Sequence, residues 1–460
     1  MSDMYEALVK IVGKNYVSNQ KEERYFYGRD PGLMSPHEPD YVVMPRTTEE
    51  VQKIVKLANK EKIPVVPKGG GLALTGLVIP LKGGIVMDMK RIDKILEVNE
   101  RARYVIVEGG TTEGGLKSYL EKHHPSLRHS IPDAPPIATV VANAVIHGQG
   151  RLTQQYGFNS DMVTGLEVVL PTGEICRIGS CSISKYWFSR GAPMPDLSGL
   201  FLGWLGTTGV ITKMGLKLYP RKKIRDVEVF VTDKEDLVPD ILFKLTHTEM
   251  VEDINIWCQP HPPMFRENHH VTILITGDSE EELQFKKKMI WDALQEYIDS
   301  KDGGFMWVMP DAKPTFLEMP LESLSKFADV RKGGGFEYSG PIVLAEDYPE
   351  CSRKLAELAV KYKLTYSGMV RVIGRSHCIM FGFAYTFNRA DLDEMDRVRK
   401  ALHEVAEFAL EQGGTHWKPT VDEQKMMMER MDPDTLKLMG KIKGLLDPNG
   451  IMNPRNWEVG

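Results

Sequence analysis

Three consecutive glycines beside a lysine form the segment of this chain with the clearest capacity for chemistry. The chain reads Lys68-Gly-Gly-Gly-Leu-Ala-Leu-Thr-Gly76, directly after the apolar run Ile63-Pro-Val-Val66. Glycines allow positive φ and close approach of the backbone to a ligand, and consecutive N–H groups in such a loop can surround a phosphate. Lys68 would add a positive charge. Glycine turns are also common after strands without any ligand, so the loop alone leaves both interpretations open.

The elements around this loop are those of a βαβ unit. Residues 40–45 form a β-rich run that ends at a proline, and Thr47-Thr48-Glu49-Glu50 is typical of a helix start. Behind it, apolar residues recur at positions 51, 54, 55 and 58, which is the spacing of one helix face. The run 63–66 is then the second strand. Strand, helix, strand and glycine loop together predict a site for an anionic group at the end of the unit.

The remaining pattern divides the chain into three parts. Short strands continue to about residue 218, including a hairpin at 166–178, and residues 1–222 are predicted to form the first domain. Residues 223–415 alternate strands with longer helices, which predicts an α+β domain with helices on one face of an antiparallel sheet. Residues 416–460 are expected to pack back toward the first domain. The predicted fold class is therefore α+β.

Composition excludes several functional classes. The 460 residues carry 58 Lys and Arg against 63 Asp and Glu, a formal charge of −5, which gives no electrostatic footprint for nucleic acid. The first residues are polar and acidic, unlike a signal peptide, and no apolar run approaches the length of a membrane span. The five cysteines are scattered, without a CxxC pair. We expect a cytoplasmic protein with no membrane span and no iron–sulfur cluster or structural zinc of its own.

Several ordered motifs extend this pattern over nearly the whole chain. The start, Val42-Val-Met-Pro-x-Thr-x-Glu-Glu-Val51 followed by the glycine loop, resembles the FAD-binding domain of the vanillyl-alcohol oxidase and p-cresol methylhydroxylase superfamily. Further matches follow in the family's order: Pro132-Asp133, Ala138-Thr139, Asn143-Ala144, His147-Gly148, Tyr156-Gly157, Gly165-Leu-Glu-Val-Val-Leu-Pro-Thr-Gly173, Leu200-Phe-Leu-Gly203, Gly206-Thr-Thr-Gly-Val-Ile-Thr212 and Leu446-Asp-Pro-Asn-Gly-Ile-Met-Asn-Pro454. The chain is similar to this superfamily along most of its length.

The resemblance implies FAD between two α+β subdomains of the first domain, with the second domain as a substrate-binding cap. It implies the pyrophosphate on the glycine loop and these cofactor contacts: Lys68, Gly69, Gly70, Gly71, Leu72, Ala73, Thr75, Gly76, Pro132, Ala138, Thr139, Ala142, Asn143, His147, Gly148, Tyr156, Gly157, Gly209, Val210, Ile211 and Asn453. Val210 and Ile211 also fit an ordinary core strand. The loop 69–76 has no histidine or cysteine to tether a flavin, so we expect non-covalent FAD. His147 leaves a covalent alternative open.

Within the superfamily, the length of the chain and its C-terminal segment most resemble the branch that contains the glycolate oxidase large subunit and the D-lactate and D-2-hydroxyglutarate dehydrogenases. That branch carries two histidines seven residues apart and a later Glu-His pair, which together hold a divalent metal. Here His377 matches the second histidine, but position 370 is valine, and the later pair reads Thr415-His416. Two ligands make a poor metal site, so no bound metal is expected. His377 also fits a histidine beside a core strand.

The candidates for catalysis are the side chains suited to move a proton or hold a carboxylate. A histidine with a pKa near neutrality suits the base that takes the hydroxyl proton, and His416 and His377 are the candidates. Arg371, Arg375 and Lys418 could fix a substrate carboxylate, since guanidinium groups pair with it bidentately. Each of these cations also fits an ordinary surface charge.

The expected function is that of an FAD-dependent dehydrogenase that oxidises a hydroxy acid, of the D-2-hydroxy class. Its electrons would pass to a partner such as an iron–sulfur subunit, a cytochrome or an electron-transferring flavoprotein. An aromatic segment resembles the phenol-oxidising members, and Trp187, Phe188 and Trp204 either line an apolar pocket or belong to the core. An oxidoreductase of a phenolic or other alcohol is therefore the alternative. A non-catalytic FAD electron-transfer subunit and an ether-lipid synthase type also stay open.

Overall fold

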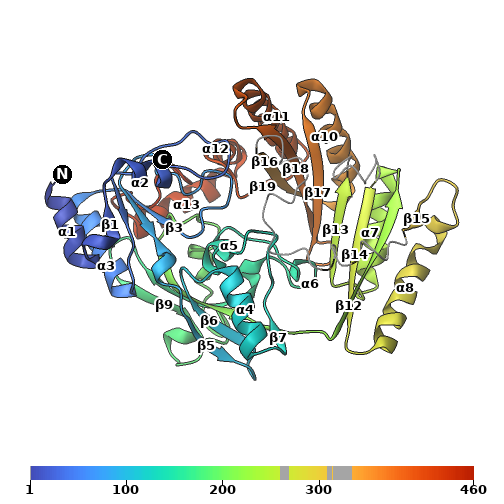
Figure 1. Ribbon diagram of the computed structural model, residues 1–460, viewed down its shortest axis with the longest axis horizontal. Coiled ribbons are helices and arrows are strands. Elements are labelled where there is room, and N and C mark those ends of the chain that lie inside the picture. Colours follow the sequence, from blue (N-terminus) through green and yellow to red (C-terminus); the bar gives the residue numbers. More distant parts are fainter. Residues whose placement is uncertain (1, 259–268, 308–312, 314–316, 318–333, 460) are drawn as a thin grey trace.

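The computed structural model describes residues 2–258, 269–307, 313, 317 and 334–459. Figure 1 shows two bodies side by side, which we call the N-terminal domain and the cap domain. The predicted boundary after residue 222 falls between strands β11 (Tyr219–Pro220) and β12 (Ile224–Thr232). The predicted boundary after residue 415 falls inside β19 (Thr415–Trp417), so the cap sheet extends two residues further. The predicted α+β fold class is confirmed.

The first subdomain of the N-terminal domain contains the predicted βαβ unit. Its elements are α1 (Ser2–Val12), β1 (Val17–Ser18), α2 (Lys21–Tyr27), β2 (Tyr41–Val43), α3 (Thr48–Glu61), β3 (Val65–Lys68) and β4 (Ile85–Asp88). The sheet order is β1-β2-β4-β3, with β2 and β3 parallel to β4. Helix α3 begins where the sequence predicts, because the Thr47 side chain accepts a hydrogen bond from the N–H of Glu50.

The second subdomain is built on a five-stranded antiparallel sheet in the order β5-β6-β10-β8-β9. Its elements are β5 (Ile95–Asn99), β6 (Tyr104–Glu108), α4 (Glu113–His123), β7 (Leu127–Arg128), α5 (Val140–Val145), α6 (Thr153–Tyr156), β8 (Val163–Val169), β9 (Ile175–Gly179), β10 (Val210–Lys217) and the already named β11. The predicted hairpin is the pair β8–β9. Its turn lies between Val169 and Ile175.

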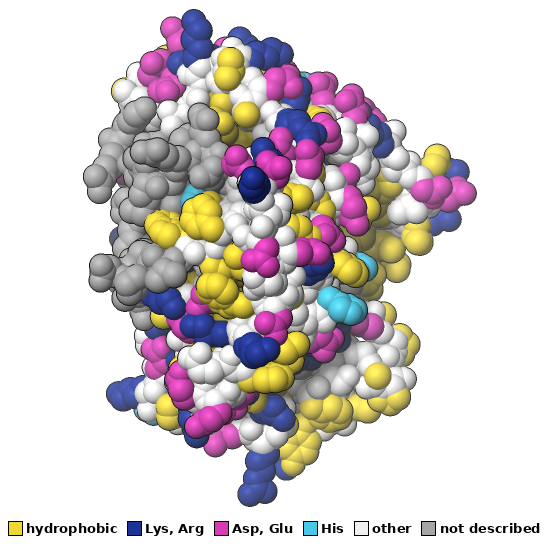
Figure 2. All heavy atoms as spheres, turned by 90° about the vertical axis from the view of Figure 1, so that its right-hand side faces the viewer, with side chains coloured by type: hydrophobic (Ala, Val, Ile, Leu, Met, Phe, Trp, Pro, Cys, Tyr) yellow, Lys and Arg dark blue, Asp and Glu magenta, His cyan; other side chains and the backbone are white. Residues whose placement is uncertain are grey.

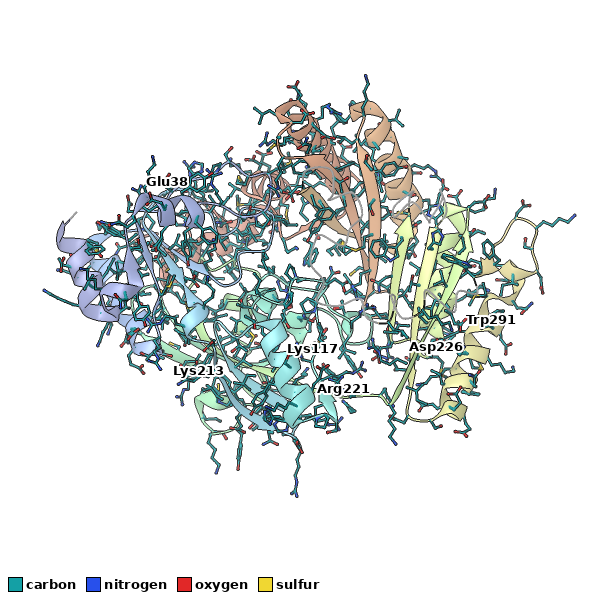
Figure 3. All side chains as sticks on the ribbon, in the orientation of Figure 1. Glu38, Lys117, Lys213, Arg221, Asp226 and Trp291 are labelled. Atoms are coloured by element: carbon teal, nitrogen blue, oxygen red, sulfur yellow. The ribbon has the colours of Figure 1, made fainter. Side chains whose placement is uncertain are left out.

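A buried carboxylate joins the two subdomains. Glu167 on β8 accepts hydrogen bonds from Thr48 Oγ1 of the first subdomain at 3.0 Å and pairs with Lys213 Nζ of β10 at 2.8 Å. Figure 3 labels Lys213 within the sheet region of the N-terminal domain. The basic and hydroxyl partners lower the pKa of Glu167 in spite of its burial. The Glu167 carboxylate thus links the first subdomain, through Thr48, to the sheet of the second subdomain, and this link helps to set the distance between the two.

The cap domain is an eight-stranded antiparallel sheet in the order β15-β12-β14-β13-β17-β18-β16-β19. The elements not yet given are α7 (Val238–His247), β13 (Asp253–Cys258), β14 (His269–Gly277), α8 (Glu280–Ile298), β15 (Phe305–Met306), β16 (Gly334–Val343), α10 (Tyr348–Tyr362), β17 (Thr365–Ile373), β18 (Cys378–Asn388) and α11 (Leu392–Glu411). Asp226, labelled in Figure 3 on the cap sheet, anchors α8 through Lys287 at 2.8 Å. The predicted arrangement of helices on an antiparallel sheet is therefore present.

Strand alternation gives the cap sheet two different faces. On β17 and β18, Val370, Val372 and Phe381 belong to the hydrophobic core that includes residues of α7, α8, α10 and α11. Met369 and Arg371, one position away from Val370, turn to the opposite face toward the N-terminal domain. Successive side chains of a strand point to opposite faces. Met369 and Arg371 on β17 therefore face the interface between the two domains.

A cluster of four charged side chains crosses that interface. Arg371 Nη1 donates to both carboxylate oxygens of Asp253, at 2.8 and 2.9 Å, and to the carbonyl of Gly150 at 2.9 Å. Arg371 Nη2 donates to Asp133 of the N-terminal domain, and Arg151 lies 3.4 Å from Asp253. Asp253 is fully buried. Because a buried charge is costly unless it is paired, this cluster fixes how the cap sits on the first domain.

The C-terminal residues return to the N-terminal domain. Helices α12 (Val421–Arg430) and α13 (Pro433–Leu446) lead to a segment in which Met452 bridges Val65 of β3 and the N–H of Asn453 donates to the Val65 carbonyl at 2.8 Å. Figure 1 shows α13 beside β3. Asn453 thereby lies next to the glycine loop that follows β3.

The described surface has mixed character. Figure 2 shows acidic and basic side chains interspersed with small hydrophobic groups on the outer face of the cap. Within the described residues, no helix is both long enough and apolar enough to span a bilayer.

Removal of the Asp253 charge should destabilise the protein strongly. In Asp253→Asn, Arg371 and Arg151 lose a fully buried counter-ion, and loss of one partner of a buried ion pair costs about 3–5 kcal/mol. We expect a clear drop in melting temperature, measured by circular dichroism. The matched control is Asp396→Asn, which breaks the exposed pair with Lys400 on α11 and should leave the melting temperature nearly unchanged. Equal melting temperatures for the two variants would refute the structural role of Asp253.

Candidate active site

A deep cavity lies between the two subdomains, and we call it the cofactor cavity. With its open mouth it encloses about 1130 Å³. Its walls are Pro67, Lys68, Gly69, Gly70, Gly71, Leu72, Ala73, Leu77, Val78, Met89, Gly109, Ala134, Ala138, Thr139, Val141, Ala142, Asn143, Val145, Ile146, Phe201, Leu205, Gly206, Gly209, Val210, Ile211, Lys418 and Asn453. The space suits an elongated ligand such as a dinucleotide.

The glycine loop after β3 forms one wall of this cavity. Within the described residues, the N–H groups of Gly69, Gly70 and Gly71 donate to no protein acceptor, so they are available to an anion. Gly71 has φ +67°, and a Cβ built there would lie 2.6 Å from Lys68 Cε. A side chain at this position would therefore be strained. Lys68 is buried at the end of β3, and burial lowers the pKa of its amine.

Two buried oxygen atoms in the walls of the cavity have no hydrogen-bond partner among the described residues, and they indicate whether the walls fit a polar cofactor. Thr139 Oγ1 and Asn453 Oδ1 are buried and have no hydrogen-bond partner within the described protein. Asn453 is otherwise fixed, because its Nδ2 donates to the carbonyls of Leu77 at 3.0 Å and Leu205 at 2.7 Å. Buried polar atoms in native proteins almost always find a partner. A ligand with hydroxyl and phosphate groups would supply one, so the residues present fit FAD.

The structure brings most of the cofactor residues predicted from the sequence to this cavity. They are Lys68, Gly69, Gly70, Gly71, Leu72, Ala73, Ala138, Thr139, Ala142, Asn143, Gly209, Val210, Ile211 and Asn453. Val210 and Ile211 also belong to the two hydrophobic cores on either side, so the core-strand interpretation is correct for both, and their contact with the cofactor stays a prediction.

The other predicted cofactor residues do not line the cofactor cavity. Pro132 lines the neighbouring cavity described below, while Thr75 lines a separate hollow beside Glu337. The N–H of Gly76 donates to Asp30 at 2.7 Å, and that of Gly148 donates to the Asn143 carbonyl at 2.7 Å. His147 Nδ1 instead lies 2.7 Å from Ser160 Oγ. Tyr156 stacks on Tyr219 at the surface, and Gly157 follows it in a third hollow.

A second cavity opens beside the first, between the N-terminal domain and the cap sheet, and we call it the substrate cavity. With its mouth it encloses about 860 Å³. Its walls are Leu72, Leu74, Pro132, Asp133, Ala134, Pro135, Asn143, Ile146, Gln149, Asn255, Phe336, Tyr338, Met369, Arg371, Met380, Trp417 and Lys418. Leu72, Ala134, Asn143, Ile146 and Lys418 line both cavities. The two cavities therefore adjoin at these five residues.

Lys418 is the ionisable group at the junction of the two cavities. Its side chain is buried against the rings of Trp417 and Tyr338, and its amine donates to the Tyr338 hydroxyl. Burial lowers the pKa of Lys418 to about 7, although the nearby Glu337 carboxylate opposes that shift. Burial disfavours the charged form of an amine. Near neutral pH, a large fraction of Lys418 is thus an uncharged amine that can accept a proton.

Arg371 and Gln149 supply the other strong hydrogen-bonding groups of the substrate cavity. The Arg371 guanidinium is held by Asp253, Gly150 and Asp133, as described above. Gln149 is buried, and both its amide nitrogen and its amide oxygen lack a hydrogen-bond partner within the described protein. An unsatisfied buried amide costs about 1–3 kcal/mol for each group, so this side chain is suited to a ligand.

The predicted catalytic role of His416 does not fit its position. His416 lies in β19, and alternation turns its ring away from Trp417 and from both cavities. Its Nε2 lies 3.1 Å from the Ala406 carbonyl of α11, and its Nδ1 lies 3.7 Å from Glu423. Burial lowers its pKa. The loop that contains His416 does reach the site, through the next two residues rather than the histidine.

His377 and Arg375 are also placed away from the site. Both lie in the turn that joins β17 to β18, beside Tyr156 and Gly157 in the third hollow. Arg375 forms an exposed ion pair with Glu249. The strands of this hairpin extend past the cavity before they turn, so residues of the turn cannot reach it. Of the five predicted catalytic residues, the structure brings Arg371 and Lys418 to the substrate cavity.

The structure places the residues of the incomplete metal motif and of the aromatic segment. Position 370, where the related branch has histidine, faces the cap core as a fully buried valine. Among the described residues, no group of three His, Cys, Asp or Glu side chains could hold a metal ion. Trp187 packs in the N-terminal domain beside Tyr104 and Cys181. Neither it nor Phe188 nor Trp204 lines the two cavities, so the core interpretation is the correct one for Trp187.

Sequence reasoning missed four polar residues of the substrate cavity: Asp133, Gln149, Asn255 and Tyr338. Asp133 follows the predicted cofactor residue Pro132 in a matched motif, which was a usable signal. Gln149 directly follows the His147-Gly148 pair, so the neighbouring motif was a usable signal. Asn255 and Tyr338 lie on cap strands that are far apart in the chain, and nothing in their local sequence sets them apart from other strand residues.

Two protein-family models match this chain. A model described as an FAD-binding domain matches residues 39–179, and one described as the C-terminal domain of FAD-linked oxidases matches residues 260–457. The first match contains the glycine loop and α5, and the second contains Arg371, Lys418 and Asn453. The two matches thus cover both sides of the two cavities.

Known proteins resemble the chain over nearly its full length. Glycolate oxidase subunit GlcD of Bacillus subtilis is 23% identical, over 98% of this chain and 96% of its own. The mitochondrial D-lactate dehydrogenase [cytochrome] of Arabidopsis thaliana is 28% identical, over 97% of this chain and 78% of its own. The crystal structure of p-cresol methylhydroxylase with substrate bound has a TM-score of 0.86 at 21% identity, over 99% of this chain and 96% of its own.

The family matches, these relatives and a cavity whose unpaired polar atoms fit FAD agree with the motifs of the sequence. The chain therefore belongs to the FAD-linked oxidases of the vanillyl-alcohol oxidase and p-cresol methylhydroxylase superfamily, and it is an FAD-dependent oxidoreductase of hydroxy compounds.

Proposed function

We propose that this protein is a dehydrogenase that oxidises a D-2-hydroxy acid and passes the electrons to a partner protein. The observation that carries the proposal is the position of Lys418 at the junction of the two cavities, with Arg371 in the same substrate cavity. One group can take a proton, and the other can hold a carboxylate. Glycolate oxidase and D-lactate dehydrogenase among the relatives support the hydroxy-acid class.

The cofactor cavity would hold FAD without a covalent bond. The N–H groups of Gly69, Gly70 and Gly71 would bind its pyrophosphate, and Thr139 Oγ1 and Asn453 would bind its polar groups. Bound FAD supplies the acceptor for a hydride from the substrate carbon. Among the residues that the structure describes, the walls of the cavity contain neither histidine nor cysteine, the residues that tether flavins in some members of the superfamily. His147, the alternative tether, is turned toward Ser160.

Lys418 would act as the base that takes the hydroxyl proton. A catalytic base works best when its pKa lies near the working pH, and burial brings that of Lys418 to about 7. The Tyr338 hydroxyl accepts a hydrogen bond from the amine, and the Trp417 ring covers it, so the side chain is held in one place. These contacts also keep water from one side of the amine.

Arg371 would orient the substrate through its carboxylate. Its guanidinium is planar and rigidly held, and its Nη2 group, which now donates to Asp133, can donate a charge-assisted hydrogen bond to a substrate carboxylate. The remaining walls are largely apolar, with Leu74, Phe336 and Met380 among them. We therefore propose a 2-hydroxy acid whose other substituent is apolar.

The electrons would leave through a protein acceptor such as an iron–sulfur subunit, a cytochrome or an electron-transferring flavoprotein. The name of the Arabidopsis relative specifies a cytochrome. The five cysteines of the sequence are scattered and include no CxxC pair, which supports an external acceptor over a cluster within this chain.

A phenolic or other aromatic alcohol is the second candidate substrate. Phe336, Tyr338 and Trp417 line the substrate cavity and would accept an aromatic ring. The similarity in fold to p-cresol methylhydroxylase agrees with this candidate without selecting it.

Substitution of Gly71 should impair flavin binding. Gly71→Ala places a methyl group on a backbone with φ +67°, which costs about 1–2 kcal/mol. We expect FAD affinity to fall about tenfold, measured as flavin absorbance per protein after gel filtration. The matched control is Gly413→Ala, which has the same kind of backbone at φ +80° and no neighbouring atom within 4 Å. Full flavin content in Gly71→Ala would contradict the assignment of the loop.

Lys418 should give the rate of flavin reduction a characteristic pH dependence. A base must be unprotonated to act, so the rate should rise with pH, about tenfold per unit, and level off above a pKa of about 7. In Lys418→Met, we expect the rate to fall by about 10²–10⁴ and to lose this pH dependence. The measurement is anaerobic stopped-flow reduction with a reactive hydroxy acid.

Lys418→Arg serves as its control, because it keeps a positive charge but cannot give up a proton near neutral pH. It should be as slow as Lys418→Met if Lys418 is the base. If Lys418→Arg retains the full rate, the lysine is an electrostatic group and the base lies elsewhere.

Three probes separate the two candidate substrate classes. D-Lactate has a carboxylate without a ring, benzyl alcohol has a ring without a carboxylate, and (R)-mandelate has both. Under anaerobic conditions, we expect (R)-mandelate and D-lactate to bleach the flavin absorbance, with (R)-mandelate faster, and benzyl alcohol to leave it unchanged. Bleaching by benzyl alcohol or 4-hydroxybenzyl alcohol alone would replace the hydroxy-acid proposal with the second candidate. Bleaching by no probe would favour a non-catalytic electron-transfer subunit.

A further inference from the structure

We propose that Asp133 is a specificity-determining residue that occupies the outer edge of Arg371 until a substrate carboxylate displaces it. This inference rests on the proposed function, because it assumes that Arg371 receives a carboxylate. Asp133 Oδ2 accepts a hydrogen bond from Arg371 Nη2, and both residues line the substrate cavity. A carboxylate of the protein thus occupies the position that a substrate carboxylate would need.

The two carboxylates on Arg371 are held very differently. Asp253 is fully buried and accepts hydrogen bonds from Arg371, Arg151 and Asn255. The side chain of Asp133 is 32% exposed, and within the described residues its carboxylate has Arg371 as its one hydrogen-bond partner. The loss of a single partly exposed contact costs little, whereas the buried one is costly to break. Asp133 is therefore the carboxylate that can leave.

Charge balance explains why the cavity would need such a residue. Arg371 and Arg151 face Asp253 and Asp133, so the cluster is neutral as it stands. An incoming carboxylate that replaces Asp133 keeps a carboxylate on Nη2, while Asp133 can turn to solvent through its exposed side. A ligand without a carboxylate would leave Asp133 in place. Binding to Arg371 would then select carboxylate ligands through this exchange.

Gln149 gives a second, independent reason to place a polar group of the ligand here. Its buried amide has no partner, and it lines the substrate cavity next to Gly150, whose carbonyl accepts from Arg371 Nη1. Gln149 and Arg371 line the same cavity, and the Asp133 carboxylate in its present position leaves the Gln149 amide unpaired within the described protein. A second polar group of a ligand bound to Arg371 could therefore pair with this amide.

Phenylacetate provides the test, because it has a ring and a carboxylate but no hydroxyl group to oxidise. Its dissociation constant is measured on the flavin-loaded protein from the change in the visible flavin spectrum. Asp133→Asn removes the competing charge and should bind phenylacetate about fivefold more tightly, the scale of a partly exposed ion pair. Binding of benzyl alcohol should change less than twofold. Asp133→Ser should behave like Asp133→Asn, and Asp133→Glu should restore the affinity of the wild type.

The matched control is Asp196→Asn, which removes another partly exposed carboxylate paired with an arginine, Arg190, at 2.9 Å. It lies outside both cavities and should leave the binding of phenylacetate unchanged. Equal or weaker binding of phenylacetate by Asp133→Asn and Asp133→Ser, with binding by the wild type intact, would overturn the inference alone. If neither wild type nor variants bind phenylacetate while benzyl alcohol perturbs the flavin, the proposed function falls and the inference with it.

Discussion

Arg371 reaches from the cap sheet into the N-terminal domain with a charge that cannot be buried alone. Asp253 on a neighbouring cap strand neutralises it, and Asp133 and the Gly150 carbonyl receive it on the other side. Arg151 of the N-terminal domain approaches Asp253 in turn. Because every member of this cluster needs a partner from the other domain or from its own sheet, the two domains have one favourable relative position. That position creates the substrate cavity.

The rest of the site depends on that position. The cofactor cavity is formed largely within the N-terminal domain, by the glycine loop, α5 and β10. Lys418, which follows the last strand of the cap sheet, closes it on the cap side. A second contact supports the same arrangement, since Glu337 of the cap accepts a hydrogen bond from the N–H of Leu33 at 2.7 Å. Burial raises the pKa of Glu337 to about 8. The cap thereby sets both the shape and the charge of the cavity.

The sequence was informative wherever function depends on local backbone. The glycine loop, the Thr47 cap of α3 and the β8–β9 hairpin follow from local residue types, and the structure contains all three. The site residues of the second domain were harder to predict from the sequence, because the face of the sheet on which a side chain lies depends on the exact bounds and register of its strand. His416 lies within β19 and faces α11, whereas Lys418 follows the end of that strand at φ +52°, where alternation no longer applies, and reaches the cavities. Gln149 and Tyr338 line one cavity from the two domains, and nothing in the local sequence of Tyr338 signals that position.

The most direct test of this account is a crystal structure of the flavin-loaded protein with phenylacetate. We expect the FAD pyrophosphate on the N–H groups of Gly69 to Gly71 and the flavin ring at the junction beside Lys418. We also expect the phenylacetate carboxylate on Arg371, with Asp133 turned away. FAD in another position, or phenylacetate outside the substrate cavity with Asp133 still bound to Arg371, would contradict it.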